Sequence, residues 1–153
     1  MPKLRAALRL MIVASAVMFA AVVHARQPET YAGIVKGVAV GGYDAVAYFT
    51  DKKAVKGLPK FSFSYKDVTW RFANEKNLEL FKANPEAYAP QYGGYCAFAV
   101  SHNATAHGDP RYWSVVNGKL YLNFSASVKK DWEKEPAFHI ERADKNWPGV
   151  LDR

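Results

Sequence analysis

The sequence predicts a single small α+β domain with two antiparallel β-hairpins and flanking short helices. Two observations carry this prediction. Apolar and polar residues alternate over residues 61–72, and residues 112–116 and 119–124 flank Asn117-Gly118, the strongest short-range signal of a hairpin turn. Segments that begin with helix-capping residues follow both stretches, so strands and helices are mixed along the chain. The sequence predicts neither an internal repeat nor a domain boundary.

The first 25 residues have the composition of a secretory signal peptide. Residues 1–9 carry three basic side chains and no acidic one, residues 10–23 are apolar, and small residues precede an expected cleavage after Ala25. The apolar run is shorter than the roughly 20 residues that a membrane-spanning helix needs. We therefore expect a mature chain, residues 26–153, that is periplasmic or secreted and has no stable membrane anchor.

Removal of this leader leaves a modest positive charge. The leader holds three of the 21 basic residues and none of the 14 acidic ones, so the mature chain has 18 basic residues and a net charge of +4. The mature chain has no long basic run, which argues against a nucleic-acid partner. All three Met residues also leave with the leader, and they are soft ligands that exported copper carriers use.

In chain order, residues 27–40 are expected to be extended and Gly41-Gly42 to form a turn. One or two helical turns are expected over residues 43–49, with Asp44 near their start. A polar loop follows over residues 52–59, where Gly and Pro punctuate the chain.

The first hairpin is predicted from alternation over residues 61–65 and 68–72, with a turn at Lys66-Asp67. Asn74 is the expected N-cap of the next helix, because its side chain can accept a hydrogen bond from the first helical turn. That helix is expected to end before Pro85.

The segment Tyr95–Val100 is apolar throughout and is expected to be buried, but its length does not distinguish a helix from a strand. A polar loop is expected over residues 101–110. The second hairpin turns at Asn117-Gly118, where both residues can adopt positive φ. Ser125 or Ser127 is the expected cap of a following helix that ends near residue 135, and another helix is expected over residues 138–147.

Several motifs of the mature chain are shared with one family. They are Trp70-Arg71-Phe72-Ala73, Phe81, Asn84-Pro85-Glu86-Ala87-Tyr88, and the segments Gly41–Phe49, Tyr92–Ala97 and Asn117–Asn123. Through these motifs the chain resembles the YHS domain family, and in particular its small exported bacterial members. The resemblance covers nearly all of the mature chain and implies a YHS-like α+β domain over residues 26–151, with the family core at about residues 41–124.

This resemblance implies a metal-binding role, with copper as one candidate, because many YHS domains carry a pair of Cys where the second strand of the hairpin meets the helix. The matching positions here are Ala73 and Asn77. Neither can ligate a soft metal ion, since Ala has no donor atom and an amide oxygen is a hard ligand. A metal site in this chain would have to use its single Cys and its histidines.

Cys96, the single Cys, is open to two interpretations. As a small apolar residue between Tyr95 and Phe98 it would be part of the core. An unpaired thiol is also open to oxidation in an exported protein. If Gly93-Gly94 begins a helix, the helix N-terminus would lower the thiol pKa, and the thiolate would bind copper or zinc or form a mixed disulfide.

His102 and His107 follow Cys96 in the predicted polar loop and are candidate metal ligands, with Asp109 able to complete a mixed site. Their spacing is wider than in zinc fingers, and a solvated loop explains them equally well. His139 is expected to be a half-exposed surface residue. Ser101 beside His102 does not make a nucleophile and base pair, and the chain has no nucleophile-elbow or nucleotide-binding glycine motif, so we predict no enzymatic activity.

Two functions therefore remain open. The first is an exported, non-enzymatic binding module for a soft metal ion such as copper or zinc, anchored by Cys96 and supported by His102 and His107. The second is an aromatic-rich accessory domain that binds a protein partner or a small apolar ligand, with Cys96 as a structural residue. The free thiol and nearby histidines favour the first, whereas the missing Met residues and Cys pair favour the second.

Overall fold

The computed structural model describes residues 24–153, so the predicted signal peptide lies outside the described residues except for His24 and Ala25. Helices and two antiparallel two-stranded sheets confirm the α+β class. Among the described residues, no helix is long and apolar enough to cross a membrane. The elements in chain order are η1 (Ala39–Gly42), α1 (Ala47–Thr50), β1 (Leu58–Tyr65), β2 (Val68–Phe72), α2 (Glu75–Ala83), α3 (Pro85–Tyr88), η2 (Gln91–Gly94), α4 (Ala97–Ser101), β3 (Asp109–Val116), β4 (Lys119–Asn123), α5 (Ala126–Trp132), α6 (Pro136–Asn146) and η3 (Gly149–Asp152).

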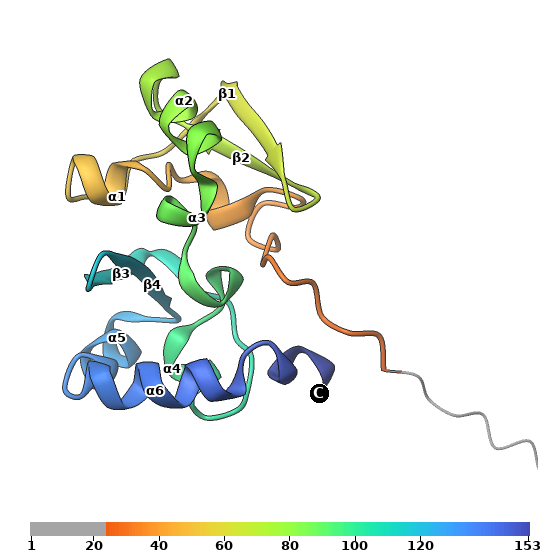
Figure 1. The fold of residues 1–153 in the computed structure, drawn as a ribbon, viewed down its shortest axis with the longest axis vertical. Helices are drawn as coiled ribbons and strands as arrows, with labels where there is room; N and C mark the ends of the chain where they lie inside the picture. Colours follow the sequence, from red (N-terminus) through yellow and green to blue (C-terminus); the bar gives the residue numbers. More distant parts are fainter. Residues whose placement is uncertain (1–23) are drawn as a thin grey trace, which may run out of the picture.

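The molecule has two halves that stack along its long axis (Figure 1). One half contains η1 to α3, and the other contains η2 to η3. The lead-in before η1 forms only isolated bridges and no strand, although residues 27–40 were expected to be extended. It contacts the second half before it reaches the first, since the Gln27 N–H donates to the Leu151 carbonyl (2.9 Å) and the Tyr31 N–H donates to the Gly93 carbonyl (2.8 Å).

The first hairpin is confirmed, although β1 begins at Leu58, inside the predicted loop. Lys66 and Asp67 both have positive φ, 50° and 61°, and form the tight turn between β1 and β2. Asn74 caps α2 as predicted, because its Oδ1 accepts a hydrogen bond from the Asn77 N–H (2.8 Å).

The second half resolves the ambiguity at Tyr95–Val100 in favour of a helix. Cys96 is the N-cap of α4, a single helical turn that is buried on most of its surface. The second hairpin turns at Asn117-Gly118 with positive φ at both residues, 50° and 72°, as predicted. Ser125, not Ser127, caps α5, since its Oγ accepts a hydrogen bond from the Val128 N–H (3.3 Å).

The prediction of no internal repeat is wrong, because the two halves repeat one backbone pattern. Each begins with a left-handed turn, at Val40-Gly41 (φ 52° and 57°) and at Tyr92-Gly93 (φ 57° and 62°). Each then forms a short helix, a hairpin with one register shift, and a capped helix that a second helix follows.

Individual hydrogen bonds also recur in the two halves. The Asp44 N–H donates to the Val55 carbonyl (2.8 Å), and the Cys96 N–H donates to the Ala106 carbonyl (2.9 Å). The register shifts follow equivalent first pairs, Leu58 with Phe72 and Asp109 with Asn123. The repeat is also visible in the sequence, since residues 41–47 (GGYDAVA) and 93–99 (GGYCAFA) are identical at five of seven positions, whereas the two halves differ at most other core positions.

The two halves have separate cores that share strand β4. Leu120 and Leu122 are fully buried in the core of the first half, with Trp70 and Phe72. Tyr121 lies between them in the sequence and packs in the core of the second half. Successive side chains of a strand point to opposite faces, so β4 is a layer between the two cores.

Candidate functional site

Cys96 is buried in the second half, with 1% of its surface exposed. Its thiol donates to the Asn123 Oδ1 (3.6 Å), which also accepts a hydrogen bond from the Phe98 N–H (3.1 Å). Burial raises the pKa of the thiol above its usual range, and the backbone N–H groups of Ala99, Phe124 and Phe98 oppose this rise without cancelling it. At neutral pH the residue is therefore a protonated thiol inside the core.

The two predicted histidine ligands lie in different surroundings. The His102 ring is near the Phe98 carbonyl (2.8 Å from Nδ1) and packs against the Phe98 ring. The His107 ring packs between Tyr31 and Phe124. Over residues 24–153, no three side chains of His, Cys, Asp or Glu are gathered as a metal site requires.

Asp109, the fourth predicted member of the mixed site, is held by Arg111. The guanidinium Nε and Nη2 donate to its two carboxylate oxygens at 2.9 and 2.6 Å. These bonds are the largest cause of the lowered pKa of Asp109. Its carboxylate is thus bound to Arg111 at the start of β3.

His139 is buried, with 7% of its surface exposed, so the prediction of a half-exposed surface histidine is wrong. Helix α6 packs against α4, and the His139 Nδ1 lies 3.0 Å from the Ser101 Oγ. The same hydroxyl lies 3.0 Å from the His102 Nδ1, and it donates to the Phe98 carbonyl (2.7 Å). Burial lowers the pKa of His139, and His102 lowers it further.

Ala73 and Asn77, at the positions of the Cys pair of many YHS domains, lie together around Asp44. The Ala73 N–H and the Asn77 side-chain amide both donate to the Asp44 Oδ2, each at 2.8 Å. The Asp44 Oδ1 accepts from the N–H groups of Val46 (2.8 Å) and Ala47 (3.2 Å). This buried carboxylate joins the start of α1, the residue after β2, and α2 within the first half.

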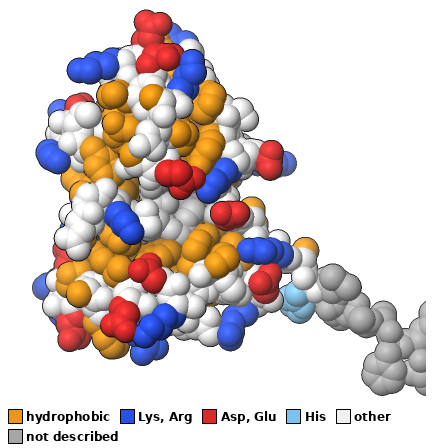
Figure 2. Space-filling view, viewed as in Figure 1, with side chains coloured by type: hydrophobic (Ala, Val, Ile, Leu, Met, Phe, Trp, Pro, Cys, Tyr) orange, Lys and Arg blue, Asp and Glu red, His pale blue; other side chains and the backbone are white. Residues whose placement is uncertain are grey.

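A cleft of about 350 Å³ lies between the two halves. Charged side chains gather around this hollow (Figure 2). The first half supplies the end of the β1–β2 hairpin and α3, and the second half supplies η2, the start of β4 and the end of α6. The lining residues include the aromatic side chains of Tyr65, Trp70, Tyr92 and Trp147.

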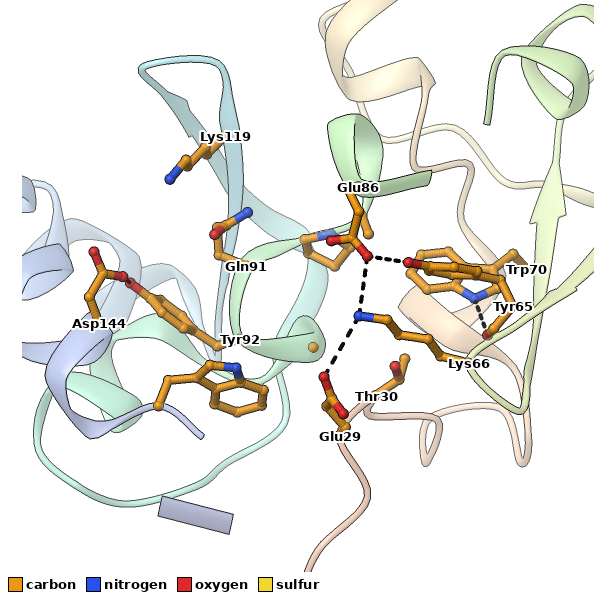
Figure 3. Close-up of a pocket in the computed structure, with 14 residues that line it drawn as sticks. Glu29, Thr30, Tyr65, Lys66, Trp70, Glu86, Gln91, Tyr92, Lys119 and Asp144 are labelled. Carbon is orange, nitrogen blue, oxygen red and sulfur yellow. Dashed lines mark hydrogen bonds and ion pairs between the residues drawn. The ribbon is translucent and has the colours of Figure 1, made fainter. Parts of the chain in front are cut away.

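On the first-half wall of the cleft, charges of opposite sign are paired. The Lys66 ammonium lies 3.3 Å from the Glu86 Oε1 and 3.7 Å from the Glu29 Oε1. The Tyr65 hydroxyl also donates to Glu86 (Figure 3). This hydrogen bond is the largest cause that lowers the pKa of Glu86, which therefore stays ionised at neutral pH.

On the second-half wall, Asp144 faces the cleft beside Tyr92 (Figure 3). The Tyr92 hydroxyl donates to the Asp144 Oδ1 (2.8 Å). Burial and this carboxylate raise the pKa of Tyr92, so the phenol remains a donor and orients Asp144. Lys119 and Gln91 lie on the same side of the cleft.

Sequence reasoning missed this cleft because its lining comes from segments far apart in the chain. Glu29 lies in the lead-in, Lys66 in a hairpin turn, and Asp144 near the end of α6. None of these positions forms a motif with another. The aromatic content of the sequence was the one available signal, and it indicated a core or a groove equally well.

Comparison of the chain with known protein families, curated proteins and solved structures finds no match. The resemblance to YHS domains therefore depends on the motifs alone and stays a prediction.

Proposed function

We propose that this protein is an exported, non-enzymatic binding module related to YHS domains, and that it binds a small polar ligand in the cleft between its halves. The observation that carries the proposal is the cleft itself. Its volume is at the lower end of the range of about 300–1,000 Å³ that is usual for small-molecule sites. It also combines aromatic walls with charged groups, which is how such sites hold and orient a ligand.

This proposal modifies the second of the two functions that the sequence left open. Cys96 is structural in it, as in that interpretation, but the ligand is polar rather than apolar because Glu29, Glu86, Lys66 and Asp144 line the cleft. The burial of Cys96 and the separate surroundings of His102 and His107 support the cleft over a metal site. Binding of copper or zinc through Cys96 remains the alternative to be tested.

The test measures ligand binding in the cleft and metal binding at Cys96 in the same protein. Reduced mature chain is titrated with a panel of amino acids, amines, carboxylates, sugars and nucleosides while the amide signal of Gly93 and the indole signals of Trp70 and Trp147 are followed by NMR. We expect saturable shifts at these three residues with at least one organic probe. If no organic probe moves them, the proposal fails.

A parallel titration with Cu(I) or Zn²⁺ uses the native chain and the variants Cys96→Ser and His102→Ala. We expect equal metal affinities in all three proteins. A loss of affinity of about tenfold or more in Cys96→Ser would instead support the metal-binding module.

A further inference from the structure

The charges on the second-half wall of the cleft are of both signs and are not paired with each other. Among residues 24–153, neither Lys119 nor Asp144 lies within ion-pair distance of an opposite charge. The Asp144 carboxylate accepts a hydrogen bond from the neutral Tyr92 hydroxyl, its one side-chain donor in the part of the chain that the structure describes. This wall therefore presents a free ammonium group and a free, oriented carboxylate to the same cavity.

The opposite wall does not offer a competing site of this kind. Lys66 is engaged by Glu29 and Glu86, and Glu86 also accepts from Tyr65. A ligand carboxylate at Lys66 would have to displace these carboxylates. The positions open to a charged ligand without such displacement are thus Lys119 and Asp144.

Beside these two charges the cleft offers polar and aromatic surface. Gln91 lies on the same wall as Lys119 and Asp144 in Figure 3 and provides an amide with both a donor and an acceptor. Trp147 and Tyr92 line the same part of the cavity, and their rings lie 5.9 Å apart. An apolar side chain of a ligand would pack against these rings while its charged groups met Lys119 and Asp144.

We propose that the ligand of this cleft is a small zwitterion, a free α-amino acid with an apolar side chain. Its carboxylate pairs with Lys119, its ammonium group pairs with Asp144, and its side chain packs on Trp147. This inference rests on the proposed function, because it assigns a ligand class to the same cleft. Both charged contacts are required, since each matches one unpaired group of the wall.

The test uses three probes that share one aromatic ring. Phenylalanine carries both charges, phenethylamine carries only the positive one, and 3-phenylpropionate carries only the negative one. Dissociation constants are measured by calorimetry on the mature chain. We expect phenylalanine to bind at least tenfold more tightly than either singly charged probe, because each of those probes loses one charge-assisted contact.

Two variants assign the contacts. Asp144→Asn should weaken phenylalanine and phenethylamine about tenfold and leave 3-phenylpropionate unchanged, whereas Lys119→Gln should weaken phenylalanine and 3-phenylpropionate and leave phenethylamine unchanged. Asp131→Asn and Lys145→Gln are the matched controls. They remove exposed charges that pair with Lys134 and Glu141 outside the cleft, and they should leave all three affinities unchanged.

The possible outcomes separate this inference from the proposed function. If a singly charged probe binds as tightly as phenylalanine, or if the two variants weaken all three probes equally, the zwitterion inference is overturned and the cleft remains a ligand site. If neither these probes nor the wider panel shifts the NMR signals of Gly93, Trp70 and Trp147, both proposals are overturned together.

Discussion

At the residue scale, Asp44 and Cys96 occupy equivalent positions of the repeat. The Asp44 carboxylate accepts from three backbone N–H groups, those of Val46, Ala47 and Ala73. The three backbone N–H groups that act on the Cys96 sulfur belong to the counterparts of those residues, which are Phe98, Ala99 and Phe124. A carboxylate in one half and a thiol in the other thus face equivalent sets of backbone N–H donors, which supports the proposal that Cys96 is a structural residue.

We predict that Asp44→Ala destabilises the protein by about 3 kcal/mol or more. The change leaves three backbone N–H groups and the Asn77 amide without their acceptor in a buried place, and each unpaired group costs roughly 1–3 kcal/mol. Urea unfolding followed by Trp fluorescence measures the loss. Asp51→Ala, at the exposed end of α1, is the control and should change stability by less than about 0.5 kcal/mol.

The buried His139 makes stability depend on pH. Its pKa is lowered by burial, then by His102 and Arg142, whereas Glu135 acts in the opposite direction. In the unfolded chain a His side chain has a pKa of about 6.5, so it binds a proton more readily there than in the folded chain. The contribution of His139 to the free energy of unfolding is therefore fully present above about pH 6.5 and decreases as the pH falls below that value.

We therefore expect the urea midpoint to decrease between pH 7.5 and pH 5.5. The native carboxylates whose pKa is lowered, such as Glu86 and Asp109, titrate at lower pH and contribute little in this window. In His139→Gln the decrease should be smaller. An equal decrease in the variant would show that another group causes the pH dependence.

At the scale of the elements, the second hairpin depends on its turn. Gly118 has a φ of +72°, and a Cβ added there would meet no other atom within 4 Å. The cost of Gly118→Val is therefore the backbone strain of a β-branched residue at positive φ, and we predict a loss of about 1–3 kcal/mol. Gly149→Ala is the control, since that position is equally open and lacks positive φ. A loss below about 0.5 kcal/mol in Gly118→Val would contradict this account.

The elements that sequence reasoning predicted well are those whose signals are local. Both hairpins and the Asn74 cap follow from residues within a few positions of one another. Helix α4 could not be distinguished from a strand, because its single turn is apolar on all sides. The burial of His139 depends on α6 packing against α4, and the cleft depends on how the two halves stack, so neither has a local signal.

At the scale of the whole molecule, the lead-in joins the predicted processing site to the fold. Gln27 bonds to Leu151, and Arg26 lies 3.5 Å from Asp152, so the chain is held from the first residues after the expected cleavage. We predict that the mature protein begins at Arg26. N-terminal sequencing of the protein recovered from the periplasm measures this. Recovery of a chain that begins at Met1 and sediments with membranes would contradict it.

Strand β4 also determines how the protein unfolds. Leu120 and Leu122 complete one core and Tyr121 completes the other, so neither half can open without exposing apolar surface of both. We therefore expect the two halves to unfold as one cooperative unit despite their repeated architecture. The amide hydrogens of β4 then exchange with solvent only when the whole chain unfolds, and their exchange rates report the global free energy of unfolding.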